Sequence, residues 1–342
     1  MNYIRRISRG WLIFLIIAVV LSIIGCIKAK PQLIKKISPD SFAVVILPDT
    51  QFYSKRYPDT YYEQTQWIVD NKDTLNIKFA IHLGDITHDN IPEQWEVADK
   101  AHRTLDGADV PYSMIPGNHD MPEMGRFRDT SRYNKYFGPE RFLGKKWYGG
   151  HMGITNDNNY TFFEWTNLRF MVVSLEYAPT DEALTWAYKL IEQYKDRRVI
   201  VVTHCFQTKG GRHKKDCATA YNLEGNGAHT VWQELISKHR NIFMVLSGHV
   251  TGVKHKIRRG DAGNEVHEIL TDYQDERAEL DGIKSGNGWM RILQFNPNEN
   301  KIHVSSLSVD GVKRFYETDR YNRDPAHSDH AFSFHYDMKT RI

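Results

Sequence analysis

Cysteine is scarce in this chain, with only Cys26, Cys205 and Cys217 among 342 residues. Three cysteines cannot form a disulfide-rich scaffold, and they leave a Cys205–Cys217 disulfide or two free thiols as equal alternatives. Internal repeats and low-complexity tracts are also missing, which excludes a repeat architecture. Hydrophobic residues (41%) and charged residues (25%) instead occur in the proportions of a globular protein with an ample core.

The sequence also lacks a hydrophobic run with the length of a membrane-spanning helix. The apolar run from Trp11 to Ile24 has 14 residues, whereas such a helix needs about 20. The run follows Arg5, Arg6 and Arg9 and has the length of the apolar region of a secretory signal. We therefore expect a signal peptide at 1–25, with an uncleaved signal anchor as the alternative.

The stretch Ile23-Ile24-Gly25-Cys26 resembles the lipobox of bacterial lipoproteins, in which cleavage before the cysteine leaves that residue to carry lipid. The resemblance implies lipid attachment at Cys26, a tether at 26–41 and export to the membrane or surface of the bacterial cell envelope. Basic residues of the tether suit a position near anionic lipid headgroups: Lys28, Lys30, Lys35 and Lys36.

The chain that follows the predicted signal peptide lacks an excess of charge of either sign. Removal of residues 1–25 takes away three of the 45 basic residues and none of the 42 acidic ones, which leaves 42 of each. A formally neutral chain without a basic, aromatic-rich stripe gives no support for nucleic acid as a partner or for a nuclease. The oligomeric state is not defined by these features.

Apolar segments that end in polar residues alternate with amphipathic helical patterns. Strands are expected at 42–50, 77–85 and 111–120, with helices at 61–72 and 92–107 between them. This alternation predicts right-handed crossovers and a mostly parallel, buried sheet within one domain, 42–342. Further strands are expected at 168–176, 197–205, 241–250, 253–258, 265–271, 288–295, 301–308 and 331–338, and further helices at 181–194 and about 229–239.

Chemically versatile residues stand at five of the expected strand ends. A strand-end Asp alone is usually a helix cap, and a lone His is usually a hydrogen-bonded core residue, but five such tips in succession indicate a common site. Ligands of parallel sheets bind at the carboxyl ends of the strands. Carboxylate, amide and imidazole ligands suit one or two divalent ions such as Mn²⁺, Fe, Zn²⁺ or Mg²⁺. The tips are Asp49-Thr50-Gln51, Gly84-Asp85, Gly117-Asn118-His119-Asp120, Thr203-His204 and Gly248-His249-Val250-Thr251.

The order of these tips resembles the pattern D-x-H, G-D, G-N-H-D/E, H and G-H-x-H of the calcineurin-like metallophosphoesterases, over residues 49–251. Segments 158–187, 270–276, 286–295 and 332–338 are similar to an exported bacterial branch of that superfamily. The resemblance implies a four-layered α/β/β/α sandwich. It also implies hydrolysis of a phosphomonoester or phosphodiester by a metal-activated water.

Site roles follow from the same resemblance, position by position. Asp85 would bridge two metals and Asp49 would bind the first of them. Asn118, His204 and His249 would complete the second metal site. His119 would be the general acid, with Asp120 orienting its ring.

Two positions depart from the family pattern, because Gln51 and Thr251 stand where it has histidines. Gln51 can still offer its amide oxygen, and His255 is a candidate substitute for the second missing imidazole. The oxygen-rich first site then favours Mn²⁺ or Mg²⁺ over Zn²⁺. These departures leave a catalytically weak or inactive binding protein of the cell envelope as the alternative function.

Further polar residues are expected near the site. Tyr273, Gln274 and the loop 207–216 are in this group. The basic residues of the loop are either phosphate contacts or members of a solvated loop.

Overall fold

The computed structural model describes residues 37–275, 285–309, 315–316 and 329–340. Residues 315–316 are described by their backbone alone. The predicted signal peptide, Cys26 and most of the predicted tether therefore lie outside the described residues. The chain divides into two units between Lys36 and Ile37, inside the predicted tether. In the described ranges, no helix combines the length and the apolar character that crossing a bilayer requires.

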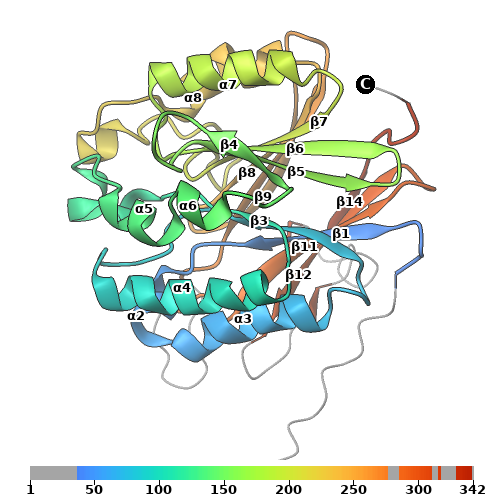
Figure 1. The fold of residues 1–342 in the computed structure, drawn as a ribbon. Helices are drawn as coiled ribbons and strands as arrows, with labels where there is room; N and C mark the ends of the chain where they lie inside the picture. Colours follow the sequence, from blue (N-terminus) through green and yellow to red (C-terminus); the bar gives the residue numbers. More distant parts are fainter. Residues whose placement is uncertain (1–36, 276–284, 310–314, 317–328, 341–342) are drawn as a thin grey trace, which may run out of the picture. The chain divides into compact units, whose positions relative to one another are not determined.

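Two seven-stranded sheets form the framework of the unit that begins at Ile37 (Figure 1). In the first sheet the order is β13 (Phe315–Tyr316), β12 (Lys301–Ser308), β11 (Trp289–Asn296), β1 (Phe42–Leu47), β2 (Ile77–His82) and β3 (Tyr112–Ser113), and β14 (Phe332–His335) pairs with β12. In the second sheet the order is β4 (Tyr148–His151), β5 (Asn159–Trp165), β6 (Leu168–Leu175), β7 (Arg198–Thr203), β8 (Ile242–Ser247), β10 (Glu265–Asp272) and β9 (Gly252–Arg259).

Both sheets are mixed, so the expectation of a mostly parallel sheet is wrong. Strands β1, β2 and β3 are parallel to one another, as are β6, β7, β8 and β10. The remaining strands pair antiparallel; for example, β1 lies beside β11, with Phe42 opposite Phe295. A strand such as β1 is buried along its whole length, and its uniformly apolar sequence fits either strand direction.

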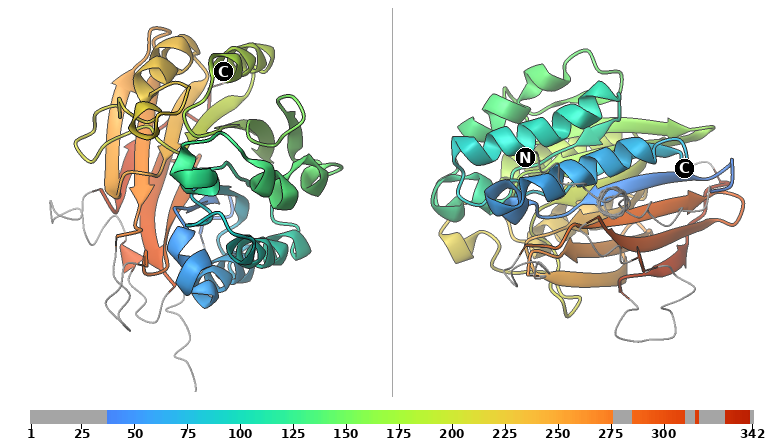
Figure 2. Two further views of the ribbon diagram at one scale, coloured as in Figure 1. Left: turned by 90° about the vertical axis from the view of Figure 1, so that its left-hand side faces the viewer. Right: turned by 90° about the horizontal axis from the view of Figure 1, so that it is seen from below.

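Helices cover the outer faces of the two sheets, α2, α3 and α4 on the first and α7 and α8 on the second (Figures 1 and 2). The four-layered α/β/β/α sandwich is thereby confirmed. The helices are α2 (Gln51–Arg56), α3 (Pro58–Asp70), α4 (Pro92–Gly107), α5 (Ser131–Phe137), α6 (Pro139–Phe142), α7 (Asp181–Gln193) and α8 (Ala228–Glu234). Short 3-10 helices are η1 (Asn118–Asp120), η2 (Pro122–Gly125), η3 (Thr219–Tyr221) and η4 (Ile236–Lys238).

Aromatic side chains fill the space between the sheets. Phe42 stacks on Phe295 of the first sheet with ring centroids 4.6 Å apart, and Phe163 stacks on Phe170 of the second at the same separation. Phe42 also meets Phe170 edge-on at 5.7 Å, which joins the two sheets in one core. Each fully buried Phe contributes roughly 1.5–3 kcal/mol through the removal of apolar surface from water.

The parallel strands point their carboxyl ends toward one end of the sandwich. The backbone N–H of His249, after β8, donates to Asp49, after β1, and the His204 ring, after β7, contacts the carbonyl oxygen of Leu83, after β2. These contacts bridge the sheets, so the strand-end residues of both sheets share one site.

Candidate metal centre

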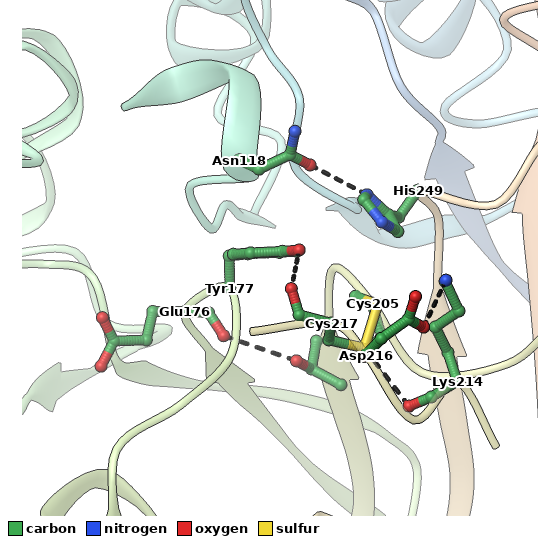
Figure 3. Close-up of a disulfide and its surroundings, with 9 residues drawn as sticks. Asn118, Glu176, Tyr177, Cys205, Lys214, Asp216, Cys217 and His249 are labelled. Atoms are coloured by element: carbon green, nitrogen blue, oxygen red, sulfur yellow. Dashed lines mark hydrogen bonds and ion pairs between the residues drawn. A yellow bond between two sulfur atoms is a disulfide. The ribbon is translucent and has the colours of Figure 1, made fainter. Parts of the chain in front are cut away.

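Three side chains from separate strand ends converge on one buried point. Ligand atoms of Asp85, His204 and His249 all lie within 4.8 Å of one another. His204 Nε2 lies 3.2 Å from Asp85 Oδ1, and His249 Nδ1 lies 2.9 Å from Asn118 Oδ1 (Figure 3). The structure thus brings together all four residues expected around the second metal.

Backbone contacts fix the orientation of these side chains. The Nδ1 atom of His204 lies 2.8 Å from the carbonyl oxygen of Leu83, which leaves Nε2 as the ring atom directed at Asp85. Asp85 Oδ1 also accepts the backbone N–H of His119 at 2.9 Å. Such supporting hydrogen bonds are the usual means of orienting metal ligands.

The donor set fits a divalent cation. Asp49 Oδ1 is buried and has no hydrogen-bond donor among the described residues, which is costly for a carboxylate unless a cation satisfies it. A Cβ on Gly248 would lie 2.1 Å from Asp49 Oδ1, and one on Gly117 would lie 2.2 Å from Asp85 Oδ1. Glycine at both positions lets the carboxylates approach the turns that carry the other ligands.

Two residues of this cluster adopt left-handed backbone conformations. Asp85 has φ of 49° and His249 has φ of 66°. Residues other than glycine pay of the order of 1–3 kcal/mol for such conformations, which persist where the surroundings enforce them. The strain coincides with the two strand ends that aim ligands at the cluster.

Negative charge dominates the electrostatics of the site. Burial raises the pKa of Asp49, and the neighbouring Asp272 raises it further. Burial also raises the pKa of Asp272, to about 7. Burial also tends to raise the pKa of Asp85, but the neighbouring His204 and His119 outweigh this effect and lower that pKa. Burial opposes protonation of His204, yet the carboxylates of Asp85 and Asp49 raise its pKa to about 10. Three buried carboxylates therefore create a strong demand for positive charge.

An amide network occupies the side of the site where the family pattern has two imidazoles. The side-chain N–H of Gln51 donates to Gln274 Oε1, and Gln51 Oε1 lies 2.9 Å from His88 Nδ1. Gln274 Nε2 in turn lies 2.9 Å from Asp272 Oδ2 and 3.5 Å from Thr251 Oγ1. Gln51 and Thr251 thus lie together, linked through Gln274; metal ligation by them stays a prediction.

His255 does not lie at the metal centre, so the expectation that it substitutes for the missing imidazole is wrong. Its Nε2 lies 3.0 Å from His267 Nδ1, and its ring stacks on Phe332 with centroids 4.2 Å apart. His255 stands four residues beyond Thr251 on β9. At about 3.3 Å per residue, an extended strand carries it roughly 13 Å away.

The orienting role expected of Asp120 is also corrected. Its carboxylate accepts the backbone N–H groups of Ile86, Thr87 and Gly117 at 2.8–3.0 Å and so braces the loop after β2. His119 Nδ1 instead lies 2.8 Å from the backbone oxygen of His88.

Sequence reasoning missed His88 and Asp272. The ring of His88 stacks on that of His119 with centroids 4.8 Å apart. His88 lies in the loop between β2 and α4 and does not directly follow an apolar strand, so the sequence pattern does not mark it. Asp272 ends β10 and meets the same strand-end criterion as the residues that were identified.

The remaining expected neighbours fall into two groups. Gln274 lies in the site, whereas the hydroxyl of Tyr273 lies 2.6 Å from Ser306 Oγ. In the loop 207–216, Lys214 forms an ion pair with Asp216 (Figure 3).

Cys205 and Cys217 form a disulfide, which resolves the two alternatives left by the sequence (Figure 3). Cys205 directly follows His204 of the cluster. The hydroxyl of Tyr177, whose ring centroid lies 5.8 Å from that of His204, donates to the carbonyl oxygen of Cys217. The disulfide therefore fixes the loop beside the metal centre.

A two-sheet sandwich thus carries a carboxylate–imidazole cluster where the parallel strands of both sheets end. Residues 42–251 match the calcineurin-like phosphoesterase family, and the chain belongs to that family.

The chain is also similar to one relative in sequence and to two solved structures in fold. The chain is 31% identical over 313 residues to the uncharacterized protein YvnB of Bacillus subtilis (strain 168); the match covers 89% of this chain and 22% of YvnB. It therefore spans about a fifth of that relative's length. A dimetal phosphatase from Danio rerio shares the fold with a TM-score of 0.50 at 12% identity, covering 80% of this chain and 98% of that one. The purple acid phosphatase PPD1 of yellow lupin does so with a TM-score of 0.53 at 13% identity, covering 89% and 55%.

Proposed function

We propose that this protein hydrolyses phosphate esters, monoesters or diesters, at the cluster of Asp85, Asn118, His204 and His249. The observation that supports this is the convergence of these side chains from four strand ends on one buried point. Divalent ions held there would supply a water of lowered pKa and positive charge beside the phosphate.

His119 is the proposed proton donor to the leaving oxygen. Its backbone N–H is anchored on Asp85, and its Nδ1 faces the backbone oxygen of His88. An Nδ1–H that donates to this oxygen leaves Nε2 as the ring atom that can exchange a proton with substrate. His119 is also partly exposed, whereas Asp85 and His204 are buried, so its ring is accessible to a substrate.

The test compares leaving groups in His119→Ala. A poor alkoxide leaving group needs a proton as the P–O bond breaks, whereas a nitrophenolate hardly does. The loss with an alkyl phosphate should therefore exceed the loss with 4-nitrophenyl phosphate, by a factor on the order of 10²–10⁴. Elemental analysis should show unchanged metal content, and His229→Ala, at an exposed position on α8, should leave both rates unchanged. Equal losses on both substrates would contradict the acid role.

A second candidate function is a cell-envelope binding protein with little or no turnover. Gln51 and Thr251 favour it, because they replace the histidines of the family pattern and because Gln274 and His88 already engage both ends of the Gln51 amide. Turnover of an aryl phosphate with added Mn²⁺ that disappears in Asp85→Asn would favour the enzyme. Metal binding without turnover on a panel of monoesters, diesters and nucleotides would favour the binding protein.

We further propose that the first metal site takes Mn²⁺ or Mg²⁺ and exchanges it readily. Asp49 and Asp85 are carboxylates, and Gln51 offers only a neutral amide oxygen, a set that suits these ions better than Zn²⁺. The site of Asn118, His204 and His249 contains two imidazoles and should hold its ion firmly. Dialysed protein should therefore retain about one equivalent of metal.

Export and lipid anchoring through Cys26 form the last part of the proposal. The Cys205–Cys217 disulfide supports it, because disulfides persist mainly in oxidising compartments outside the cytoplasm. The wild-type chain should incorporate a labelled fatty acid, whereas Cys26→Ser should remain as unmodified precursor. A wild-type chain that never incorporates the label would contradict the anchor.

A further inference from the structure

A basic cavity of about 490 Å³ lies at the end of the sandwich opposite the metal centre. Its lining includes Ile77 and Lys78, which begin β2, Pro111, which precedes β3, and Arg197, which precedes β7. The metal ligands follow the other ends of these same strands. The six residues of β2 separate the two regions by roughly 20 Å.

The lining contains four cationic side chains and one acid. Arg197 pairs with that acid, Glu164, at 2.9 Å, and Lys72 donates to the backbone oxygen of Ala108 at 2.7 Å. Lys78 and Lys146 have no ion pair with a carboxylate of the described residues. An unneutralised pair of lysines in a concave site attracts an anion.

Aromatic rings define the environment of these cations. The Lys78 ammonium lies 4.2 Å from the Trp165 ring centroid, and the Arg197 guanidinium lies 4.2 Å from that of Phe162. Burial and the nearby Lys72 lower the pKa of Lys78, which an anion in the cavity would offset. The combination of lysines and aromatic walls suits a phosphate group carried on an amphipathic molecule.

The chain enters the described unit at this same end. Ile37 donates its backbone N–H to the oxygen of Thr74 at 3.4 Å, and the Trp165 indole N–H donates to the oxygen of Asp40 at 3.0 Å. Trp165 also contacts Lys78 of the cavity. Cys26 lies 11 residues before Ile37, and a peptide of that length spans at most about 40 Å.

We propose that this cavity binds the phosphate of an anionic phospholipid headgroup in the membrane that carries the N-terminal anchor. The proposal rests on the anchor at Cys26 proposed above. Docking of the headgroup would direct the opposite end of the sandwich, with the metal centre, away from the bilayer. Substrate would then reach the metal centre from the aqueous side.

Lysine acetylation of the full-length protein in vesicles tests the proposal. The chain is reconstituted in phosphatidylcholine alone or in phosphatidylcholine mixed with phosphatidylglycerol, and acetylation rates are followed by mass spectrometry. The cavity lysines Lys72, Lys78 and Lys146 should react roughly fivefold more slowly in the anionic vesicles, the factor that corresponds to about 1 kcal/mol per basic residue near such a surface. High salt should remove the protection, and Lys189 on α7 should react equally in both vesicles.

A matched pair of variants completes the experiment. In Lys78→Gln with Lys146→Gln, the remaining cavity lysine Lys72 should lose its protection, whereas Lys100→Gln with Lys189→Gln, on the outer helices, should retain it. Equal acetylation in both vesicle types would overturn the proposal. Protection by inorganic phosphate in neutral vesicles to the same extent would assign the cavity to free phosphate and also overturn membrane docking. Fatty-acid labelling of Cys26 reports on the anchor separately.

Discussion

His82 joins the two loops that carry Asp49 and Asp85. It ends β2 and is fully buried. Its Nδ1 accepts the backbone N–H of Gly84 at 3.1 Å, so the neutral ring carries its proton on Nε2, which donates to Thr50 Oγ1 at 2.9 Å. The ring thereby fixes the residue before Asp85 and the residue after Asp49.

Replacement of His82 by Leu should destabilise the fold and weaken metal binding. The change leaves the Gly84 N–H without its acceptor, whereas the Thr50 hydroxyl still donates to the backbone oxygen of Ile86 at 3.3 Å. One buried group left unsatisfied costs about 1–3 kcal/mol, so we expect a loss of roughly 1–3 kcal/mol in the free energy of unfolding. His82→Gln keeps a donor and an acceptor and should lose less. His229→Leu, at an exposed site, should change the stability by less than about 0.5 kcal/mol.

The pH dependence of this loss provides a sharper test. Burial, with a further contribution from His204, lowers the pKa of His82 to about 3 from its ordinary 6.5. Below pH 6.5 the unfolded chain takes up a proton at His82, whereas the folded chain does not. The contribution of His82 to the free energy of unfolding is therefore complete above pH 6.5 and falls as the pH decreases toward 3. The slope is about 1.4 kcal/mol per pH unit. His82→Leu lacks this term.

The gap in unfolding free energy between wild type and His82→Leu should therefore be constant above pH 6.5. It should narrow by about 2 kcal/mol at pH 5. Urea unfolding in the presence of a chelator, followed by tryptophan fluorescence, measures the gap without a contribution from bound metal. A gap that stays the same from pH 8 to pH 5 would refute the assignment of His82 as a buried neutral imidazole.

Three further predictions concern the metals and the disulfide. Asp85→Asn should lose turnover and most bound metal in elemental analysis, and full retention of both would contradict the bridging role. Gln51→His with Thr251→His should convert the exchangeable ion into a firmly held one, whereas two firmly held zinc ions in dialysed wild type would contradict the proposed first site. Cys205→Ser with Cys217→Ser should lower the unfolding free energy by about 3 kcal/mol; wild-type stability that is unaffected by reductant would contradict this contribution.

The strand-end residues could be predicted from the sequence because their positions follow from local pattern. An apolar strand and the polar residue after it are adjacent in the chain, and parallel strands necessarily bring their carboxyl ends to one edge. Asp85 and His204 are 119 residues apart in number, yet the pattern placed both correctly. The helix expected at 92–107 was confirmed at those bounds for the same reason, since its periodicity is local.

Strand pairing could not be predicted in this way. The hairpin of β4 and β5 was missed, because Gly149 and Gly150 interrupt the alternation that marks a strand. In the segment 111–120, which was expected to be a strand, only Tyr112–Ser113 forms one, paired with β2. Met114 and Ile115, which follow this short strand, are buried but not paired with β2. A buried segment has the same apolar sequence whether or not it pairs with a neighbouring strand.

The altered first metal site illustrates why site residues cannot be read one position at a time. Gln51 and Thr251 are separate departures in the sequence, but Gln274 contacts both and also binds Asp272. A histidine at position 51 would therefore remove the hydrogen-bond donor to Gln274 Oε1. The free-energy cost of leaving this oxygen without a donor would offset part of the gain in metal affinity. Because the three polar side chains share contacts, their effects on metal binding should be non-additive. Addition of Gln274→Ala to the double histidine variant should then increase the metal affinity further, since it removes the competing amide from the site.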